Sequence, residues 1–128
     1  MPQVDSDVFH ATVYEIVRMI PHGMVTTYGH IARLAGSPAH SRLVGQALKF
    51  LQAPDVPWQR VIGAGGTISD RGDGGEGAAR QAERLREEGV NVSESGAPLR
   101  FRVNIQQYGW FPNQVSLYDS EEEAEDGE

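Results

Sequence analysis

The chain has 128 residues, no cysteine and a formal net charge of −7. This length suits one domain with a single core, and the lack of cysteine excludes disulfides, thiolate nucleophiles and cysteine-ligated metal sites. Residues 119–128 carry seven of the 18 acidic residues and no basic one, so residues 1–118 contain 11 acidic and 11 basic residues. The negative net charge therefore does not exclude a nucleic-acid partner.

The N-terminal residues 1–6 are expected to form a short arm. They lack the basic and apolar regions of a signal peptide, and no apolar run in the chain is long enough to span a membrane. We therefore expect an intracellular protein, in the nucleus of a eukaryote and otherwise in the cytoplasm. Residues 7–20 then predict an amphipathic helix, with Ser6 or Asp7 as its cap. Its inward positions would be Phe9, Val13, Ile16, Val17 and Ile20.

Two further helices follow, joined by a tight turn. The segment "VTTYGHIARLAG" predicts a short helix that Thr27 caps and Gly36 stops. In "SPAHSRLVGQALKFLQ", Ser37 can cap a helix and Pro38 suits its first position, while apolar residues recur at helical spacing up to Leu51. Two helices joined in this way form a helix-turn-helix.

The polar face of the second of these helices carries Arg42, Gly45, Gln46 and Lys49. It offers two positive charges, one amide and no bulky side chain. A glycine inside a helix costs about 1 kcal/mol relative to alanine, so something should need its missing side chain. From the helix alone, either a neighbouring part of the fold or an external partner can make that close approach.

Weaker signals follow further along the chain. Two short β-compatible pieces flank the glycine-rich residues 63–66 and predict a hairpin or wing, and no Lys-Ser or Lys-Thr pair follows to make a phosphate-binding loop. Residues 78–88 predict a charged surface helix that Gly89 closes. Residues 99–105 alternate apolar and polar side chains, which predicts a half-buried strand. Its inner face would carry Leu99, Phe101, Val103 and Ile105.

Together these elements predict a mainly α fold, namely a winged-helix-like helix-turn-helix domain with a small β hairpin or wing. We place this domain at residues 7–112. Residues 113–128 predict a disordered acidic tail that favours solubility, because from Asp119 onward the only apolar residue is one alanine.

One short segment, "VPWQRVI", places a proline before a large aromatic residue and then continues into β-branched residues. This order predicts a rigid approach to a strand, in which side chains are held in place. Taken alone, a tryptophan after a proline, as at Trp58, is most often a core residue.

The segments "IPHGMVTTYGHIARLAG", "SRLVGQALK" and "VPWQRVI" together resemble the DNA-binding domain of the O6-alkylguanine-DNA alkyltransferases. The resemblance is specifically to the alkyltransferase-like proteins, in which tryptophan replaces the alkyl-accepting cysteine. It runs from about Phe9 to Pro112. It implies a helix-turn-helix that enters the DNA minor groove and a pocket that receives a flipped alkylguanine.

The resemblance assigns roles to residues of the helix-turn-helix. Arg42 matches the arginine that takes the place of the extruded base. Tyr28 matches the tyrosine that crowds the phosphate 3′ to the target nucleotide and helps to rotate it outward. Because a minor groove is narrow, Gly45 would keep the helix face beside it small. Gln46 and Lys49 share that face and complete the expected DNA-binding set.

The lesion pocket that the resemblance implies lies beside the "PWQRV" segment. Its expected residues are Tyr28, Pro57, Trp58, Gln59, Arg60, Val61, Ser69 and Arg71. The backbone near Val61 would read the edge of the purine. Ser69 and Arg71 would lie in the loop that closes over the flipped base, where Arg71 matches an arginine that contacts the base by a cation–π interaction.

Two positions separate this chain from the active enzymes. Trp58 stands where the enzymes have the acceptor cysteine, and an indole cannot accept an alkyl group as a thiolate does, so it would serve as an apolar wall against the lesion. Gln59 stands where the enzymes and the best-known alkyltransferase-like proteins have histidine, and glutamine cannot move protons near neutral pH. Glu88 matches the glutamate of the enzymes' proton relay. We expect Gln59 to be a hydrogen-bonding strut and Glu88 to be held by backbone amides.

The resemblance implies non-enzymatic binding of O6-alkylguanine in double-stranded DNA, with nucleotide flipping that marks the damage for nucleotide excision repair. It implies no metal or cofactor, a monomer, and nucleotide excision repair proteins as further partners. Two alternatives stay open: an alkyltransferase or hydrolase with a substitute nucleophile, and a winged-helix domain that binds undamaged DNA or protein. None of the 4 histidines lies in the Pro-Trp motif, which disfavours the first alternative.

Overall fold

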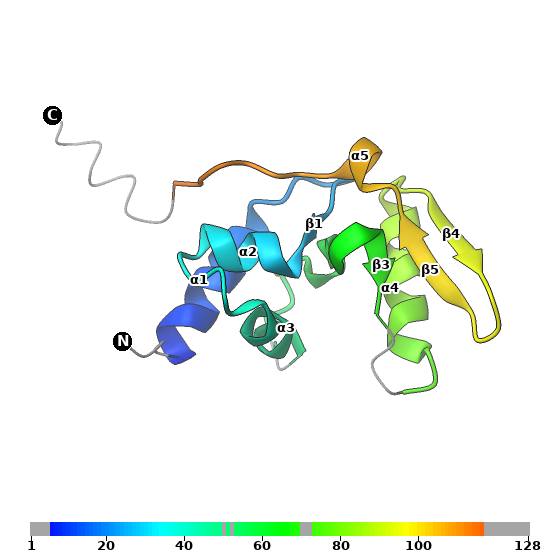
Figure 1. Ribbon diagram of the computed structural model, residues 1–128, viewed down its shortest axis with the longest axis horizontal. Coiled ribbons are helices and arrows are strands. Elements are labelled where there is room, and N and C mark those ends of the chain that lie inside the picture. The colour runs from blue at the N-terminus through cyan, green and yellow to red at the C-terminus, as the bar shows by residue number, and fades with distance from the viewer. Residues whose placement is uncertain (1–5, 50, 52, 70–72, 117–128) are drawn as a thin grey trace, which may run out of the picture.

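The computed structural model describes residues 6–49, 51, 53–69 and 73–116. These residues form two groups of elements, which lie side by side in Figure 1. The helical group consists of α1 (Ser6–Arg18), α2 (Tyr28–Leu34) and α3 (Ser41–Lys49). The second group consists of α4 (Glu76–Glu87) and a sheet in the order β3 (Thr67–Ile68), β5 (Arg100–Val103), β4 (Val92–Ser95). The predicted N-terminal arm and acidic tail lie mostly outside the described residues and stay predictions.

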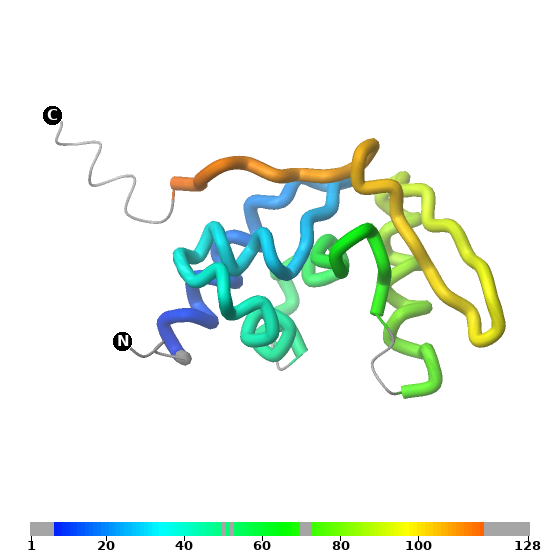
Figure 2. Tube along the Cα trace, viewed as in Figure 1, coloured from blue at the N-terminus to red at the C-terminus, as the bar shows by residue number. Residues whose placement is uncertain are grey.

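Short elements join the two groups. They are β1 (Thr26–Thr27), the 3-10 helix η1 (Trp58–Arg60), β2 (Val61–Ile62), the 3-10 helix η2 (Ala64–Gly66) and α5 (Ile105–Tyr108). β1 and β2 pair in parallel, with Thr26 opposite Val61. After α5 the chain runs back over the helical group, as the orange end of the tube in Figure 2 shows. His30 Nε2 lies 2.7 Å from the carbonyl oxygen of Pro112 and ties this returning segment to α2.

The helical group encloses the first of two hydrophobic clusters. The amphipathic helix predicted at residues 7–20 is confirmed as α1, which ends two residues earlier, at Arg18. All five of its predicted inward residues are buried, although Ile20 lies in the turn after the helix. They pack against Ile31, Ala32, Val44 and Ala47 of the helix-turn-helix. Full burial of one large apolar side chain stabilises the fold by roughly 1.5–3 kcal/mol, so this cluster fixes how α3 is presented.

The helix-turn-helix is confirmed, with one change at its turn. Thr27 caps α2 as predicted, since its hydroxyl accepts a 3.1 Å hydrogen bond from the amide of His30. Gly36 ends α2 with φ of 84°, and Ser37 N–H bonds back to the carbonyl of Ala32 at 2.9 Å. The prediction that Ser37 caps the next helix is wrong. Residues 37–40 form a turn, and α3 begins at Ser41.

The predicted wing exists, but its hairpin is not the one expected. The two β pieces on either side of residues 63–66 do not form a ladder with each other: β2 pairs with β1, whereas β3 pairs with β5. The hairpin is instead made by β4 and β5, with Ser93 opposite Arg102. Gly66 has φ of 93° and lies against the carbonyl of Val103, a close approach that a side chain would prevent.

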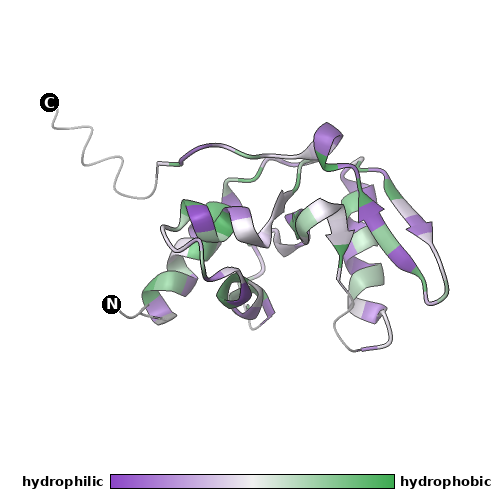
Figure 3. Ribbon diagram, viewed as in Figure 1, coloured by the Kyte–Doolittle hydropathy of each residue, from purple (hydrophilic) through white to green (hydrophobic). Residues whose placement is uncertain are grey.

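The wing buries one face of its sheet on α4. Ala78, Ala82 and Leu85 of α4 meet Phe101 and Val103 of β5 in the second hydrophobic cluster. The alternation of apolar and polar residues along β5 is visible as green and purple bands in Figure 3. Leu99, however, is 54% exposed, so the prediction that it faces inward is wrong. It lies in the turn before β5, where the two-residue periodicity no longer applies. The mainly α, winged-helix-like fold class is confirmed.

Candidate nucleic-acid interface

The polar face of α3 is turned away from the core, as its residue pattern predicts. Arg42, Gln46 and Lys49 are exposed, while Val44 and Ala47 on the opposite face are fully buried. A Cβ added to Gly45 would meet no atom within 4 Å. No neighbouring part of the described fold therefore needs the missing side chain. The packing thus argues against close approach by a neighbouring part of the fold, and it favours close approach by an external partner as the reason for Gly45.

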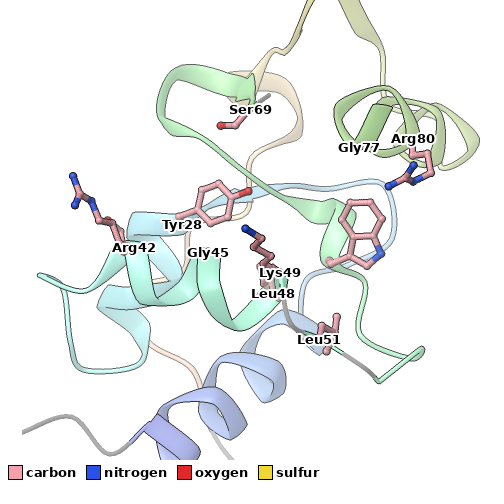
Figure 4. Close-up of a pocket in the computed structure, with 11 residues that line it drawn as sticks. Tyr28, Arg42, Gly45, Leu48, Lys49, Leu51, Ser69, Gly77 and Arg80 are labelled. Carbon is pink, nitrogen blue, oxygen red and sulfur yellow. The ribbon is translucent and has the colours of Figure 1, made fainter. Parts of the chain in front are cut away.

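A pocket of about 600 Å³ opens beside this face, between α3, η1 and the first turns of α4. Its lining residues are Tyr28, Ser41, Arg42, Gly45, Leu48, Lys49, Leu51, Trp58, Ser69, Gly77 and Arg80. In Figure 4 the Tyr28 hydroxyl, the Lys49 ammonium and the Arg80 guanidinium point into this space, whereas Arg42 points outward. Among the residues that the structure describes, the lining thus contains three basic residues and no acidic one. Such a pocket favours a flat, partly apolar ligand attached to a polyanion.

Trp58 forms an aromatic wall of the pocket. It is the first residue of η1, and its amide donates a 2.8 Å hydrogen bond to the carbonyl of Val56. The indole is half-buried, and the guanidinium carbon of Arg84 lies 5.6 Å from the centre of its ring. A cation over an indole at this distance is worth about 0.5–1 kcal/mol at an exposed site. Arg84 therefore helps to hold the orientation of the wall.

Gln59 and Glu88 meet behind η1. The Gln59 side chain, only 9% exposed, donates a 2.7 Å hydrogen bond from Nε2 to Glu88 Oε2. Glu88 Oε1 accepts a 2.8 Å hydrogen bond from the amide of Gly23. The strut contact expected of Gln59 is present. Glu88 is held by one backbone amide rather than by several.

Arg60 completes this cluster. Its Nε donates to both carboxylate oxygens of Glu88, at 3.0 and 3.1 Å, and its Nη1 donates to the carbonyl of Ile20 at 2.8 Å. Burial alone would raise the pKa of Glu88, but the hydrogen bonds from Arg60, Gly23 and Gln59 and the charge of Arg60 outweigh it and hold that pKa below its ordinary value. Glu88 is therefore an ionised structural anchor at neutral pH.

Gln81 fastens η1 to α4. This residue is 1% exposed, and its Nε2 donates to the carbonyls of Gln59 and Val61 at 3.1 and 2.9 Å. Both carbonyls belong to buried residues, so these two hydrogen bonds satisfy polar groups that water does not reach. The geometry of the "PWQRV" segment is thus maintained by a glutamine from a helix more than a dozen residues away in the sequence.

The structure brings together only part of the predicted site. Of the expected lesion-pocket residues, Tyr28, Trp58 and Ser69 line the pocket, and Arg71 lies outside the described residues. On the DNA-binding face, Arg42, Gly45 and Lys49 border the pocket, while Gln46 is exposed beside it.

Four expected pocket residues, Pro57, Gln59, Arg60 and Val61, do not line the pocket. The side chains of Gln59 and Arg60 are directed to Glu88 instead. The backbone of Val61 is also occupied, because its N–H donates to the carbonyl of Trp58 and its carbonyl accepts from Gln81. Its side chain is fully buried. These residues support the pocket wall from behind rather than forming its surface.

Sequence reasoning missed the contribution of α4. Arg80 lines the pocket, and Arg84, one turn further along the same helix, covers Trp58. The sequence contained a signal for this contribution. Arg80 and Arg84 are four positions apart and lie on the polar side of the helix, which was predicted only to be a charged surface helix. Ser41, Leu48, Leu51 and Gly77 also line the pocket and were not predicted.

A metal centre and a membrane-spanning helix find no support in the described part of the chain. Its histidine, aspartate and glutamate side chains nowhere form a group of three that could hold a metal ion. No helix within 6–49 or 73–116 is long and apolar enough to cross a membrane.

Comparisons with known proteins agree with this geometry. A family model described as "6-O-methylguanine DNA methyltransferase, DNA binding domain" matches residues 8–90. Alkyltransferase-like protein 1 of Schizosaccharomyces pombe is 46% identical over 107 residues, which cover 83% of this chain and 97% of that protein. The DNA base-flipping protein of Escherichia coli is 45% identical over 105 residues, which cover 81% of this chain and 75% of that protein.

The fold is shared with a solved complex. The crystal structure of S. pombe Atl1 with damaged DNA containing O6-carboxymethylguanine superposes with a TM-score of 0.77 and 43% sequence identity, covering 88% of this chain and all of that one. The fold of this chain and nearly half of its aligned residues are thus shared with an alkyltransferase-like protein. This chain belongs to the family of the 6-O-methylguanine DNA methyltransferase DNA-binding domain, as an alkyltransferase-like protein.

Proposed function

We propose that this protein binds O6-alkylguanine in double-stranded DNA, flips the damaged nucleotide into the pocket beside Trp58, and does not transfer the alkyl group. The observation that carries the proposal is the pocket itself, in which an aromatic wall and three basic residues open beside a helix face that has no bulk at Gly45. The relatives described above are named for base flipping or for likeness to alkyltransferases, and one is crystallised with alkylated DNA.

The outer face of α3 would make the first contact with DNA. Lys49 would contribute positive charge near the phosphates, and Gly45 would let the helix backbone approach the floor of the minor groove. Arg42 points outward from the pocket, which suits a side chain that enters the base stack where the nucleotide has left. Flipping costs a few kcal/mol and costs least for a damaged base that pairs poorly, so the damage supplies part of the selectivity.

The flipped base would then enter the pocket between Tyr28 and Trp58. Tyr28 is the first residue of α2, and the Thr27 cap fixes the start of the helix that presents it at the rim. Trp58 offers a flat apolar surface on which a purine or its alkyl group can pack. Stacking of a base on an aromatic side chain is worth roughly 1–3 kcal/mol.

No step of alkyl transfer is available to this site. The chain contains no cysteine, and Trp58 has no nucleophilic atom that could replace a thiolate. Gln59 cannot act as a proton carrier, and Glu88 is committed to Arg60 and Gly23. The lesion would therefore leave the pocket unchanged.

We further propose that the bound protein marks the lesion for nucleotide excision repair, because a protein that recognises damage without removing it needs an enzyme to act after it. Repair proteins of that pathway are then its partners. On this account the protein acts as a monomer in the compartment that holds the DNA, the nucleus in a eukaryote and the cytoplasm otherwise.

A paired binding titration tests the proposal. Duplexes that differ only in one guanine or O6-methylguanine are titrated with the protein and with Arg42→Ala and Tyr28→Ala, at one stated salt concentration. The proposal predicts tighter binding of the lesion duplex and a clear loss of that preference in both variants. Equal affinity for the two duplexes would instead support a winged-helix domain that binds undamaged DNA. Recovery of unmodified guanine from the incubated duplex would support the enzymatic alternative.

A further inference from the structure

The end of the pocket opposite Arg42 carries the positive charge of Arg80. In Figure 4, Arg80 and Arg42 lie at opposite ends of the pocket, and Arg80 comes from α4 rather than from the face of α3 that would meet the DNA. Arg84 lies four residues further along α4 and covers Trp58. Since residues four apart are neighbours on a helix, Arg80 lies beside the same wall.

The charge of Arg80 is not neutralised by a close ion pair. Among the residues that the structure describes, no carboxylate oxygen lies within 4.0 Å of its guanidinium. The charge of Arg80 acts weakly on Asp73. The pKa of Asp73 is lowered first by a hydrogen bond from the Gly77 amide and in smaller part by the charge of Arg80. Both oxygens of Asp73 already accept hydrogen bonds, from Gly75 and Gly77. Arg80 thus keeps donors available toward the pocket.

We propose that Arg80 makes the pocket selective for O6 substituents that end in a carboxylate, such as carboxymethyl. This inference rests on the proposed function, which brings the O6 substituent against Trp58. The methylene of a carboxymethyl group would pack on the indole, and its carboxylate would receive charge-assisted hydrogen bonds from the Arg80 guanidinium. The wall that Arg84 holds in place supplies the apolar contact, and Arg80 supplies the charge complement.

A second reading of Arg80 is that it contacts an acceptor on the guanine ring itself. That reading predicts an equal contribution to every O6 adduct. The lining favours the first reading, because Lys49 of α3 and Tyr28 of α2 already point polar groups into the pocket from the side of the helix-turn-helix. Arg80 is instead next to the aromatic wall, where the substituent would lie.

The test compares two adducts of the same size. Duplexes with O6-carboxymethylguanine, O6-carbamoylmethylguanine, O6-methylguanine or guanine are titrated at one ionic strength with the wild-type protein, Arg80→Met and Arg80→Lys. Arg100→Met, which removes one positive charge from the exposed wing, is the matched control. We expect the wild type to prefer the carboxylate over its neutral amide about tenfold, a difference of about 1.4 kcal/mol. Arg80→Met should bind the carboxylate and the amide with about equal affinity, while Arg80→Lys and Arg100→Met should keep most of the preference.

Equal binding of the carboxylate and the amide by the wild-type protein would overturn the inference without any variant. A preference that persists in Arg80→Met, or an equal loss for all three adducts, would overturn it too. The preference for O6-methylguanine over guanine separates this failure from failure of the proposed function, since it tests lesion recognition without a charge. It also reports whether Arg80→Met is folded.

Discussion

Gln59 and Glu88 are joined by a 2.7 Å hydrogen bond, in which a buried amide donates to a carboxylate that also accepts from Gly23 and Arg60. In the enzymes that this chain resembles, the same two positions carry protons to a reactive thiol. Here the groups that donate hydrogen bonds to Glu88 are amides and a guanidinium. These groups keep their protons near neutral pH and cannot pass them to an acceptor. The cluster has kept its structural role without the chemistry.

Restoring the cysteine alone should not restore an enzyme. Trp58→Cys provides a nucleophile, but the Gln59 amide cannot accept the proton of the new thiol. We therefore expect at most slow alkylation. Adding Gln59→His should raise the rate roughly a hundredfold, the lower end of what general acid–base catalysis contributes. Intact protein mass over time, after mixing with an O6-methylguanine duplex, measures both rates. A single variant as fast as the double variant would show that the relay position is not what limits transfer.

The ionised Glu88 should make part of the stability pH-dependent. Its folded pKa lies below the ordinary value of 4.5, so its stabilising effect is complete above that value and is lost as the pH falls through the lower folded pKa. Glu88→Gln leaves the partly buried Arg60 without a charged partner and should cost roughly 2–4 kcal/mol at pH 7.

Urea unfolding of both proteins from pH 7 to pH 3 checks this prediction. The difference in unfolding free energy should narrow as the pH drops below 4.5. Asp55 and Asp73, whose pKa values are also lowered by hydrogen bonds, are present in both proteins and cancel in the difference. A gap that stays constant over the whole range would contradict the assignment of Glu88 as an ionised anchor.

Gly45 offers a way to separate folding from DNA binding. Because a Cβ at this position meets nothing within 4 Å, Gly45→Ala should stabilise the protein by up to about 1 kcal/mol through helix propensity. In the complex the same methyl group would stand between the helix and the groove and should weaken DNA binding roughly five- to a hundredfold.

Thermal unfolding and a DNA titration of one preparation measure the two effects of Gly45→Ala. Gly29→Ala in α2, where a Cβ also meets nothing within 4 Å, controls for the gain in stability. Unchanged DNA affinity in Gly45→Ala would mean that α3 does not approach DNA through this face.

Gln81 should matter for stability although it does not line the pocket. Gln81→Leu has a similar size but removes the donor to the carbonyls of Gln59 and Val61, and each buried carbonyl left unpaired costs about 1–3 kcal/mol. We expect a loss of roughly 2–4 kcal/mol in urea unfolding. Gln107→Leu, at an exposed position in α5, should change stability by less than about 0.5 kcal/mol. Similar effects of the two substitutions would show that the Gln81 hydrogen bonds do not hold η1.

The features that the sequence predicted well depend on residues close together in the chain. The spacing of Phe9, Val13 and Ile16 is enough to predict α1, and Thr27 is a local cap for α2. The wrong predictions concern partners that are distant in sequence. Nothing near Thr67 indicates that β3 pairs with β5 rather than with β2, because strand pairing is decided by burial on α4.

The same limit applies to the site. The motif around Trp58 could be read from the sequence, but the direction of Arg60 could not, since it is decided by Glu88 and by the carbonyl of Ile20. Arg80 reaches the pocket only because the second hydrophobic cluster packs α4 on the sheet and Gln81 bonds α4 to the carbonyl of Gln59 in η1. Sequence patterns place residues on a helix face, whereas the packing of that helix decides what the face meets.

The most direct test of lesion recognition by flipping is the fluorescence of 2-aminopurine placed next to O6-methylguanine in a duplex, because its emission rises when the neighbouring base leaves the stack. Titration with the wild-type protein should give a saturating rise on the lesion duplex and little change on the guanine duplex. Arg42→Ala should give a smaller rise at saturation, since no side chain then holds the vacated position in the stack. Saturable, lesion-selective binding with no rise in fluorescence would contradict the account, because the damage would then be recognised without leaving the helix.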